Sequence, residues 1–237
     1  MKVIFLIAGK GSRLSPHTIK IHKSLIKINN QSIIGHLIKQ FHHLKVKRKD
    51  ITFITGYKSY QIKKEFGDEY NYLYYGNYSK TNNLHTMIYA NKILKNHDTI
   101  ICFSDILCSK KIIEKTLKKN INKITALVDL SKIRNGTMKV VTNKKKLISI
   151  GKLPRKKSSG NFIGILKIPR EKIGIFRKFL LKSKNKNKNF YYTEVLNDLI
   201  QHEEKIDIIN VAPNYWTEVD NILDLKMAIK NSFKLNE

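Results

Sequence analysis

Several residue types are scarce in this chain of 237 residues, and each scarcity excludes a class of protein. The two cysteines, Cys102 and Cys108, have no Cys or His neighbours at metal-ligand spacing, so neither a disulfide framework nor a zinc module is expected. No run of eighteen apolar residues occurs, which predicts no membrane span. The N-terminal MKVIFLIAG begins like a signal peptide, but its apolar part is too short, so we interpret it as a first strand in a cytoplasmic protein.

Acidic residues and arginine are also scarce. Lys and Arg total 46 against 18 Asp and Glu, giving a net charge of +28, yet only six of the basic residues are Arg. The lysines are scattered along the whole chain beside many Asn and Ile, a pattern typical of an AT-rich genome. Nucleic-acid sites favour Arg and interleaved aromatic residues. We therefore predict no specific nucleic-acid partner, although weak attraction to polyanions at low salt is expected.

Two familiar phosphate-binding fingerprints are missing near the N-terminus, although the local pattern still favours phosphate. The apolar strand of residues 1–7 runs into Gly9-Lys10-Gly11-Ser12-Arg13, and Lys23 follows. The loop lacks the Gly-Lys-Ser/Thr of a Walker A motif, and Leu14 replaces the third glycine of a dinucleotide fingerprint. Glycine lets backbone N–H groups approach a polyphosphate, and cations neutralise it. The alternative is a tight turn that needs glycine only for its backbone angles.

The order of the expected elements predicts the fold class. Up to residue 103, apolar strands alternate with helices, which indicates a parallel sheet with helices on both faces. Four strands with few helices between them then predict an antiparallel extension, at residues 124–128, 138–141, 147–150 and 161–168. We therefore predict one α/β domain over residues 1–237, with a Rossmann-like, mixed but mostly parallel sheet. Ligands of such sheets bind beyond the carboxyl ends of the strands.

Three carboxylates are candidates for a metal site. Asp105 directly follows an apolar strand, so the topology would bring it to the glycine loop. Glu218 and Asp220 lie two residues apart and share one face of an extended segment. Together with Asp105 they would form a hard oxygen site for Mg²⁺. The alternatives are a simple turn at Asp105 and an Asp220 that caps the last helix.

The polar segment Tyr78–Leu84 contains two adjacent asparagines, Asn82 and Asn83. Their amides carry donors and acceptors that can read the edge of a base. Helix capping and Asx-turn chemistry explain the same residues without a ligand.

Taken together, these segments resemble a known family. The segments LIAGKGSRL, at residues 6–14, and HKSLIKI, at residues 22–28, resemble the signature of sugar-phosphate nucleotidyltransferases, with His22 where that family usually has Pro. YSKTNNLHTMIYA resembles the bacterial phosphocholine cytidylyltransferase branch, and Phe103-Ser104-Asp105 and YWTEVD resemble its two metal-binding segments. The resemblance covers nearly the whole chain.

The resemblance implies Mg²⁺-dependent transfer of CMP from CTP to a small phosphate or phosphonate, with release of pyrophosphate. In that scheme Lys23 contacts the α-phosphate and the attacking group, and Arg13 offsets charge on the leaving pyrophosphate. Asp105, Asp220 and Glu218 would hold the metal. The nucleotide site would comprise Leu6, Ala8, Gly9, Gly11, Ser12, Thr81, Asn82, Asn83 and Ser104.

The acceptor site implied by the resemblance contains Tyr192, Glu194, Trp216 and Arg155. Basic residues and the absence of a cage tryptophan near Thr137 favour an amine- or amide-bearing acceptor, such as 2-aminoethylphosphonate or a phosphorylated amino-acid amide, over phosphocholine. A role in cell-surface polysaccharide biosynthesis would follow.

Two alternatives stay open: a sugar-1-phosphate nucleotidyltransferase using another NTP, and a non-catalytic polyanion-binding module. The sequence leaves the oligomeric state, including a homodimer, undecided.

Overall fold

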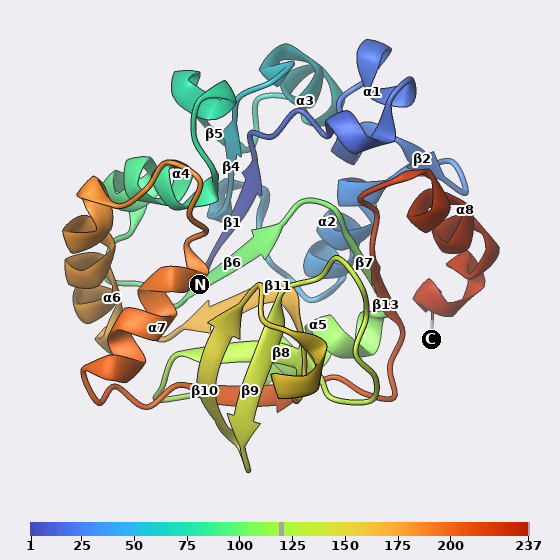
Figure 1. Ribbon diagram of the computed structural model, residues 1–237. Coiled ribbons are helices and arrows are strands. Elements are labelled where there is room, and N and C mark those ends of the chain that lie inside the picture. The colour runs from blue at the N-terminus through green and yellow to red at the C-terminus, as the bar shows by residue number, and fades with distance from the viewer. Residues whose placement is uncertain (119–120, 237) are drawn as a thin grey trace. The chain divides into compact units, whose positions relative to one another are not determined.

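The structure is a computed structural model that describes residues 1–118 and 121–236. It has the expected α/β class, with a mixed sheet and helices (Figure 1). The described residues form two compact units that interleave along the chain. We call residues 4–79, 103–118 and 214–236 the loop unit, and residues 1–3, 80–102 and 121–213 the hairpin unit. The expected single domain over residues 1–237 stays a prediction.

The loop unit contains parallel strands followed by helices, as the alternating pattern predicts. Its larger strands lie in the order β5-β4-β1, and β4 and β5 are parallel. Two short antiparallel pairs, β2–β3 and β7–β13, complete its strands. The strands are β1 (Lys2–Ile7), β2 (Lys27–Ile28), β3 (Gln31–Ser32), β4 (Ile51–Thr55), β5 (Asn71–Tyr74), β7 (Ile106–Cys108) and β13 (Trp216–Glu218).

The helices of the loop unit include one that the sequence pattern predicts with its cap. Ser32 caps α2, because its hydroxyl accepts the backbone N–H of Gly35 at 3.2 Å. The α-helices are α1 (His17–Lys20), α2 (Ile33–His43), α3 (Ser59–Phe66), α5 (Lys110–Lys118) and α8 (Ile222–Lys230). The 3-10 helices are η1 (Ser12–Leu14), η2 (Lys23–Leu25), η3 (Arg48–Asp50), η4 (Gly76–Ser79) and η8 (Ser232–Asn236).

The hairpin unit contains the antiparallel part of the sheet. Its strands lie in the order β6-β11-β8-β12-β10-β9, and the pairs are antiparallel except β12–β8, which is parallel. The strands are β6 (Thr99–Phe103), β8 (Thr125–Asp129), β9 (Lys139–Asn143), β10 (Lys146–Gly151), β11 (Gly160–Ile168) and β12 (Asp207–Asn210). The helices are α4 (Asn83–Ala90), η5 (Asn91–Ile93), η6 (Arg155–Lys157), α6 (Arg170–Lys182), η7 (Ser183–Asn185) and α7 (Thr193–Gln201).

Two local predictions need correction. Asp220 does not cap the last helix: Asn221 does, and it forms a capping box with Asp224. Asp and Asn are equally good caps, so the sequence alone does not choose between adjacent positions. Helix α5, which sequence reasoning missed, buries Ile112, Ile113 and Thr116 within a segment rich in lysine.

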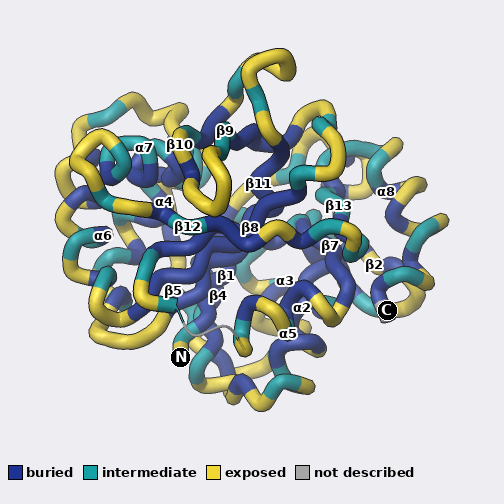
Figure 2. The backbone as a smooth tube through the Cα atoms, turned by 90° about the horizontal axis from the view of Figure 1, so that it is seen from below, coloured by how far each residue is buried: buried dark blue, intermediate teal, exposed yellow. Residues whose placement is uncertain are grey.

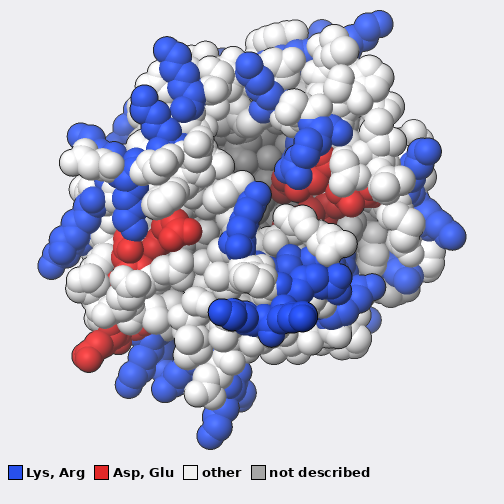
Figure 3. Space-filling model, viewed as in Figure 1, with Lys and Arg blue, Asp and Glu red and all other residues white. Residues whose placement is uncertain are grey.

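Burial and charge follow the sequence pattern. The strands are buried along much of their length, while many of the connections are exposed (Figure 2). Both cysteines are buried, and neither forms a disulfide. Lys and Arg side chains spread over the face shown in Figure 3 and do not gather in one stripe. No helix among the described residues is long and apolar enough to cross a membrane.

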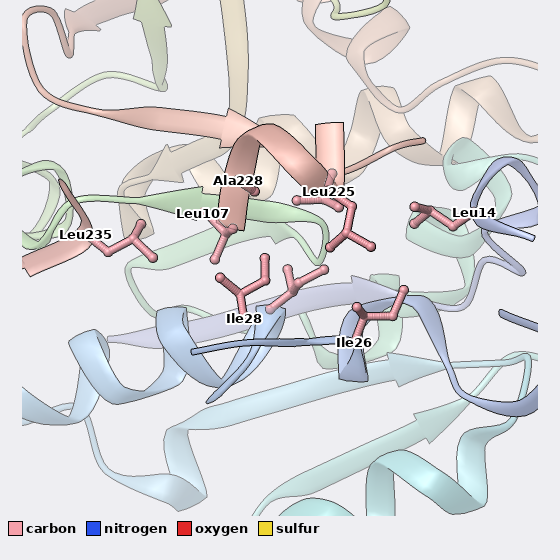
Figure 4. Packing of buried hydrophobic residues seen from close by; sticks show 9 residues of the cluster. Leu14, Ile26, Ile28, Leu107, Leu225, Ala228 and Leu235 are labelled. Atoms are coloured by element: carbon pink, nitrogen blue, oxygen red, sulfur yellow. The ribbon is translucent and has the colours of Figure 1, made fainter. Parts of the chain in front are cut away.

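An apolar cluster in the loop unit packs the segments that carry the candidate site. Leu14 follows the glycine loop, Leu107 lies on β7, and Leu225 and Ala228 belong to α8. Their side chains converge with those of the 26–28 segment (Figure 4). Burial of these side chains therefore fixes the glycine loop, β7 and α8 against one another.

We expect Leu225→Ala to lower the free energy of unfolding by about 2–4 kcal/mol, because it leaves a cavity in this cluster. Leu223 lies on the same helix but is 73% exposed, against 6% for Leu225. Leu223→Ala is therefore a matched control with an expected change within about 0.5 kcal/mol. Urea denaturation of both variants measures the difference, and equal losses would contradict this packing.

Candidate active site

The glycine loop approaches Lys23 so closely that one of its glycines cannot carry a side chain. Gly11 has a φ of 64°, in the left-handed region that favours glycine. A Cβ on Gly11 would lie 2.6 Å from Cβ and 2.7 Å from Cδ of Lys23. A Cβ on Gly9 would meet no atom within 4 Å. Gly11 is thus required by the fold, whereas Gly9 leaves open space over the loop.

Lys23 lies between two carboxylates. Its Nζ donates to Oδ2 of Asp105 at 2.6 Å and to Oδ1 of Asp220 at 2.8 Å. The Lys23 side chain is only 12% exposed, so this interaction is largely shielded from water. Arg13 reaches the same oxygen of Asp220 at 3.2 Å from the solvent side. The structure thus brings together four of the residues expected to do the chemistry.

The register of one short strand pair places the two carboxylates together. β7 and β13 are antiparallel, with Thr217 opposite Leu107 and Glu218 opposite Ile106. The pairing continues for one more bond, from the N–H of Val219 to the carbonyl of Asp105 at 2.8 Å. Asp220 therefore emerges next to Asp105. Because the capping role falls to Asn221, the Asp220 carboxylate remains available to the two cations.

Two opposing effects act on the Lys23 ammonium. Burial by itself would lower its pKa, because a charge is disfavoured away from water. The carboxylates of Asp105 and Asp220 more than compensate, and they raise the pKa of Lys23 above its ordinary value. Lys23 is therefore a permanent cation at neutral pH, not a general base.

The carboxylates suit a hard metal ion in part. Oδ1 of Asp105 is buried and has no hydrogen-bond partner within the described residues, so a metal ion could occupy this position and satisfy the oxygen. No cluster of three or more His, Cys, Asp or Glu side chains is placed to hold a metal in residues 1–118 and 121–236. Glu218 is half-buried at the end of β13. Its place in a three-carboxylate site stays a prediction.

Four further residues of the expected nucleotide site belong to the loop unit as well. Leu6, Ala8 and Ser104 are buried, and Ser12 is exposed at the start of η1. The carbonyl of Ala8 accepts the N–H of Tyr57 at 3.0 Å, and the carbonyl of Gly11 accepts the hydroxyl of Thr18 at 3.1 Å. The backbone carbonyls of Ala8 and Gly11, on either side of Gly9, are therefore both held by hydrogen bonds.

His22 is a buried neutral imidazole in the loop unit. Its Nδ1 accepts the N–H of Ser24 at 3.1 Å, so the ring proton lies on Nε2, which donates to the carbonyl of Ile7 at 3.1 Å. Burial is the main cause that lowers its pKa from 6.5 to about 4, and the nearby charges of Lys23 and Lys58 add to it. His22 thus connects the end of β1 to the turn that carries Lys23.

The two asparagines lie in the hairpin unit, where their backbone and side-chain groups bind another segment. Oδ1 of Asn82 accepts the N–H of Asn83 at the start of α4, which is the capping alternative raised by the sequence. Its Nδ2 donates to the carbonyl of Asn189 at 3.2 Å. Oδ1 of Asn83 accepts the N–H of Tyr192 at 2.8 Å. Thr81 precedes them and is half-buried. Base recognition by these residues stays a prediction.

The hairpin unit also contains three of the expected acceptor residues. Tyr192 is fully buried beside the half-buried Glu194, and burial raises the pKa of Tyr192 well above its ordinary value. Nδ2 of Asn197 contacts Glu194 at 3.4 Å. The guanidinium of Arg155 donates to the carbonyl of Ile133 at 3.2 Å and to Oδ1 of Asn135 at 3.3 Å, so it ties two loops together.

Trp216, the fourth expected acceptor residue, belongs to the loop unit. It lies on β13 and is 1% exposed, among the largest fully buried side chains of the described chain. Its ring is part of the core in this structure, and its contact with an acceptor stays a prediction.

A comparison with protein families shows which family the chain belongs to. The family model described as "Nucleotidyl transferase" matches residues 2–145, which include the glycine loop, Lys23 and Asp105. The chain belongs to the nucleotidyl transferase family. It is therefore a nucleotidyltransferase enzyme, and the resemblance noted from its motifs is confirmed.

Relatives of this nucleotidyltransferase extend over nearly its whole length. The CTP:phosphoglutamine cytidylyltransferase of Campylobacter jejuni is 25% identical, across 97% of this chain and all of the relative. Among solved structures, the inositol-1-phosphate CTP transferase from T. maritima is similar at a TM-score of 0.82 and 15% identity, over 99% and 95% of the two chains. The CTP:phosphocholine cytidylyltransferase from Streptococcus pneumoniae gives a TM-score of 0.76 and 20% identity, over 97% of each chain. These two structures support the fold.

Sequence reasoning missed three polar residues that hold the nucleotidyltransferase together. Gln61 bonds on both sides of the turn before Lys23, and Asn197 bonds to both the N–H and the C=O of Ile150. The carboxylate of Asp224 accepts the N–H of Asn221 and so completes the capping box of α8. The sequence signal for Asp224 is the Asn-x-x-Asp spacing of a capping box. Gln61 and Asn197 show no comparable pattern, because their partners are distant backbone groups.

We expect the stability of the nucleotidyltransferase to depend on pH through His22. Its pKa is about 4 when folded and near 6.5 when unfolded, so between these values the unfolded chain binds more protons. The stabilisation is complete above pH 6.5 and is lost as the pH falls to 4, by about 3 kcal/mol in all. Urea denaturation from pH 4 to 7.5 should give a steeper slope for the wild type than for His22→Asn. Parallel curves would contradict a buried neutral His22.

Proposed function

We propose that this nucleotidyltransferase is a Mg²⁺-dependent cytidylyltransferase that transfers CMP from CTP to a small phosphate or phosphonate. The observation that carries the proposal is the position of Lys23: its ammonium lies 2.6 and 2.8 Å from Asp105 and Asp220, and its aliphatic chain lies directly against the loop glycine Gly11. The choice of CTP is supported by full-length similarity to a relative whose name specifies CTP.

In the proposed reaction, an oxygen of the acceptor attacks the α-phosphorus of CTP. A bond forms between that oxygen and the α-phosphorus, and the bond from the α-phosphorus to the bridging oxygen of the β-phosphate breaks. The electron pair leaves with pyrophosphate. A phosphate dianion is already nucleophilic at neutral pH, so the reaction requires no general base, in keeping with a Lys23 that stays protonated.

The residues of the loop unit then divide the work of positioning and charge stabilisation. Backbone N–H groups of the loop from Gly9 to Ser12 bind the triphosphate. Lys23 contacts the α-phosphate, where negative charge accumulates during transfer, and the exposed Arg13 contacts the leaving pyrophosphate. Leu6, Ala8 and Ser104 form the buried wall beneath the nucleotide.

Asp105 and Asp220, with Glu218 as the third ligand, would hold the Mg²⁺. The unpartnered oxygen of Asp105 is the feature that fits a metal. A Mg²⁺ ion held there would supply positive charge that offsets the charge of the phosphates. For both carboxylates to face a metal, the Lys23 ammonium must shift from them toward the phosphates.

In the hairpin unit, Thr81, Asn82 and Asn83 would recognise the cytosine or the ribose. Asn82 and Asn83 already bind backbone groups of residues 188–192, so these contacts hold the segment in a defined shape for the nucleotide. The acceptor would contact Tyr192, Glu194 and Arg155, with Trp216 as a further residue. A carboxylate such as Glu194 suits an acceptor that carries an amine or amide group.

The acceptor class that we favour is a phosphorylated amino-acid amide. The Campylobacter relative is named for phosphoglutamine and matches this chain over its full length. The remaining candidates are 2-aminoethylphosphonate and phosphocholine. A nucleotide-linked product of this kind would serve cell-surface polysaccharide biosynthesis in the cytoplasm.

We expect Asp105→Asn to reduce pyrophosphate release from CTP and acceptor at least about 100-fold, because the metal loses a charged ligand. Asp68→Asn is the matched control in the loop unit, since Asp68 forms only an exposed pair with Lys63. A coupled pyrophosphate assay across a Mg²⁺ titration measures both variants. An Asp105→Asn enzyme as active as the control would contradict the proposed role of Asp105 as a metal ligand.

Substrate choice requires a separate panel of donors and acceptors. We expect CTP to be used at least about tenfold better than ATP, GTP or UTP, since a site built to read polar base edges rejects the wrong base. With CTP, we expect turnover with phosphoglutamine to exceed that with 2-aminoethylphosphonate, phosphocholine and glucose 1-phosphate. Turnover only with a sugar 1-phosphate and another NTP would establish the alternative sugar-nucleotide activity instead.

A further inference from the structure

The turn that carries Lys23 is held by an unusual set of hydrogen bonds within the loop unit. His22 is 1% exposed and adopts φ −63° and ψ 136°, an extended conformation outside any helix. Three of its polar groups are bound: the backbone N–H, Nδ1 and Nε2. No acidic side chain is among these partners, so the imidazole acts as a neutral connector.

Each of the two ring bonds fixes a different part of the site. The bond from Nε2 reaches the carbonyl of Ile7, the last residue of β1 before the glycine loop. The bond accepted by Nδ1 comes from Ser24, the residue after Lys23, and caps η2. One rigid ring therefore sets the spacing between the phosphate loop and the Lys23 backbone.

Gln61 on α3 braces the same turn from the other side. Its Oε1 accepts the backbone N–H of His22 at 2.7 Å, and its Nε2 donates to the carbonyl of Lys20 at 2.9 Å. A single amide thus joins the end of α1 to the start of the Lys23 turn (α1 and α3 in Figure 1). Two adjacent side chains of α3's N-terminal region, Tyr57 and Lys58, bind the carbonyls of Thr18 and Ile19.

This bracing matters because Lys23 has little freedom to correct an error in its backbone. Its Cβ and Cδ lie against Gly11, where even a methyl group would collide. Its ammonium is held by two carboxylates from distant segments. A shift of about 1 Å in the backbone would separate Nζ from one partner or drive the side chain into the loop, and such misplacement is costly in catalysis.

We propose that His22 and Gln61 are positioning residues for Lys23, and that they fix its ammonium at the phosphate-binding centre by holding the backbone turn in place. The proposal rests on the proposed function, in which Lys23 contacts the phosphates of CTP. Neither residue touches the nucleotide in this scheme; both act through Lys23.

The test is a double-mutant cycle on Mg²⁺·CTP binding, measured by isothermal titration calorimetry with the full chain. We expect His22→Ala to weaken binding about tenfold when Lys23 is present, and less than about twofold in a Lys23→Met background. Gln61→Met should behave like His22→Ala. Equal losses in both backgrounds would overturn the proposal, because a residue that only supports the fold does not depend on Lys23.

Rescue and control variants separate positioning from a general loss of packing. Asn at position 22 keeps an acceptor for the N–H of Ser24, so we expect His22→Asn to restore binding to within about threefold of the wild type. Pro at position 22 matches the φ of −63° but loses both ring bonds and the bond to Gln61, so His22→Pro should resemble His22→Ala. His36→Ala is the matched control, because His36 also binds a backbone carbonyl, that of Ile28 at 2.9 Å.

A second readout keeps this inference independent of the nucleotide. If the wild type fails to bind CTP, the proposed function fails, and the same cycle is then measured on urea unfolding. We expect Lys23→Met to change the unfolding equilibrium constant at least about threefold less in the His22→Ala and Gln61→Met backgrounds than in the wild type. Strictly additive changes in unfolding would overturn the positioning role.

Discussion

The ion pair of Lys23 with Asp105 and Asp220 is the interaction around which the candidate site of the loop unit is arranged. Two carboxylates at this separation from one ammonium would repel each other without a cation between them. Their neutralisation joins three segments that lie far apart in the sequence. In the proposed reaction, a divalent cation held by the same two carboxylates would share that neutralisation with Lys23.

The packing beneath this ion pair is equally specific. The apolar cluster joins the segment after the glycine loop, β7 and α8, and each of these carries a charged residue of the site at one end. Hydrophobic burial thus supplies the free energy that holds the charges in place. The ion pair by itself would contribute little, because burying charges offsets most of their attraction.

Much of the candidate site was predictable from the sequence, because its pattern is local. A glycine loop after an apolar strand, with Arg13 and Lys23 nearby, predicts phosphate chemistry whatever the rest of the chain does. Asp105 follows from the rule that ligands bind at strand ends. The fold class follows from the alternation of strands and helices, and the structure has it.

The rest was not predictable, because it depends on register and on distant backbone groups. The sequence offers Asp220 and Asn221 as caps, and only the β7–β13 pairing decides that Asp220 turns toward Lys23. The parallel pairing of β12 with β8 depends on tertiary contacts, because the strands of the hairpin unit have similar sequence patterns. His22 reads as a substitution for Pro until its bonds to Ile7 and Ser24 are seen.

The late position of β13 and α8 in the chain has a consequence for the newly made protein. Asp220 reaches Lys23 only when β13 pairs with β7, and β13 is held there by the packing of α8. A chain synthesised only as far as Asp105 therefore contains one of the two carboxylates that pair with Lys23. The complete centre requires β13 and α8, so a chain that stops before residue 216 would contain Lys23 and Asp105 but not the second carboxylate.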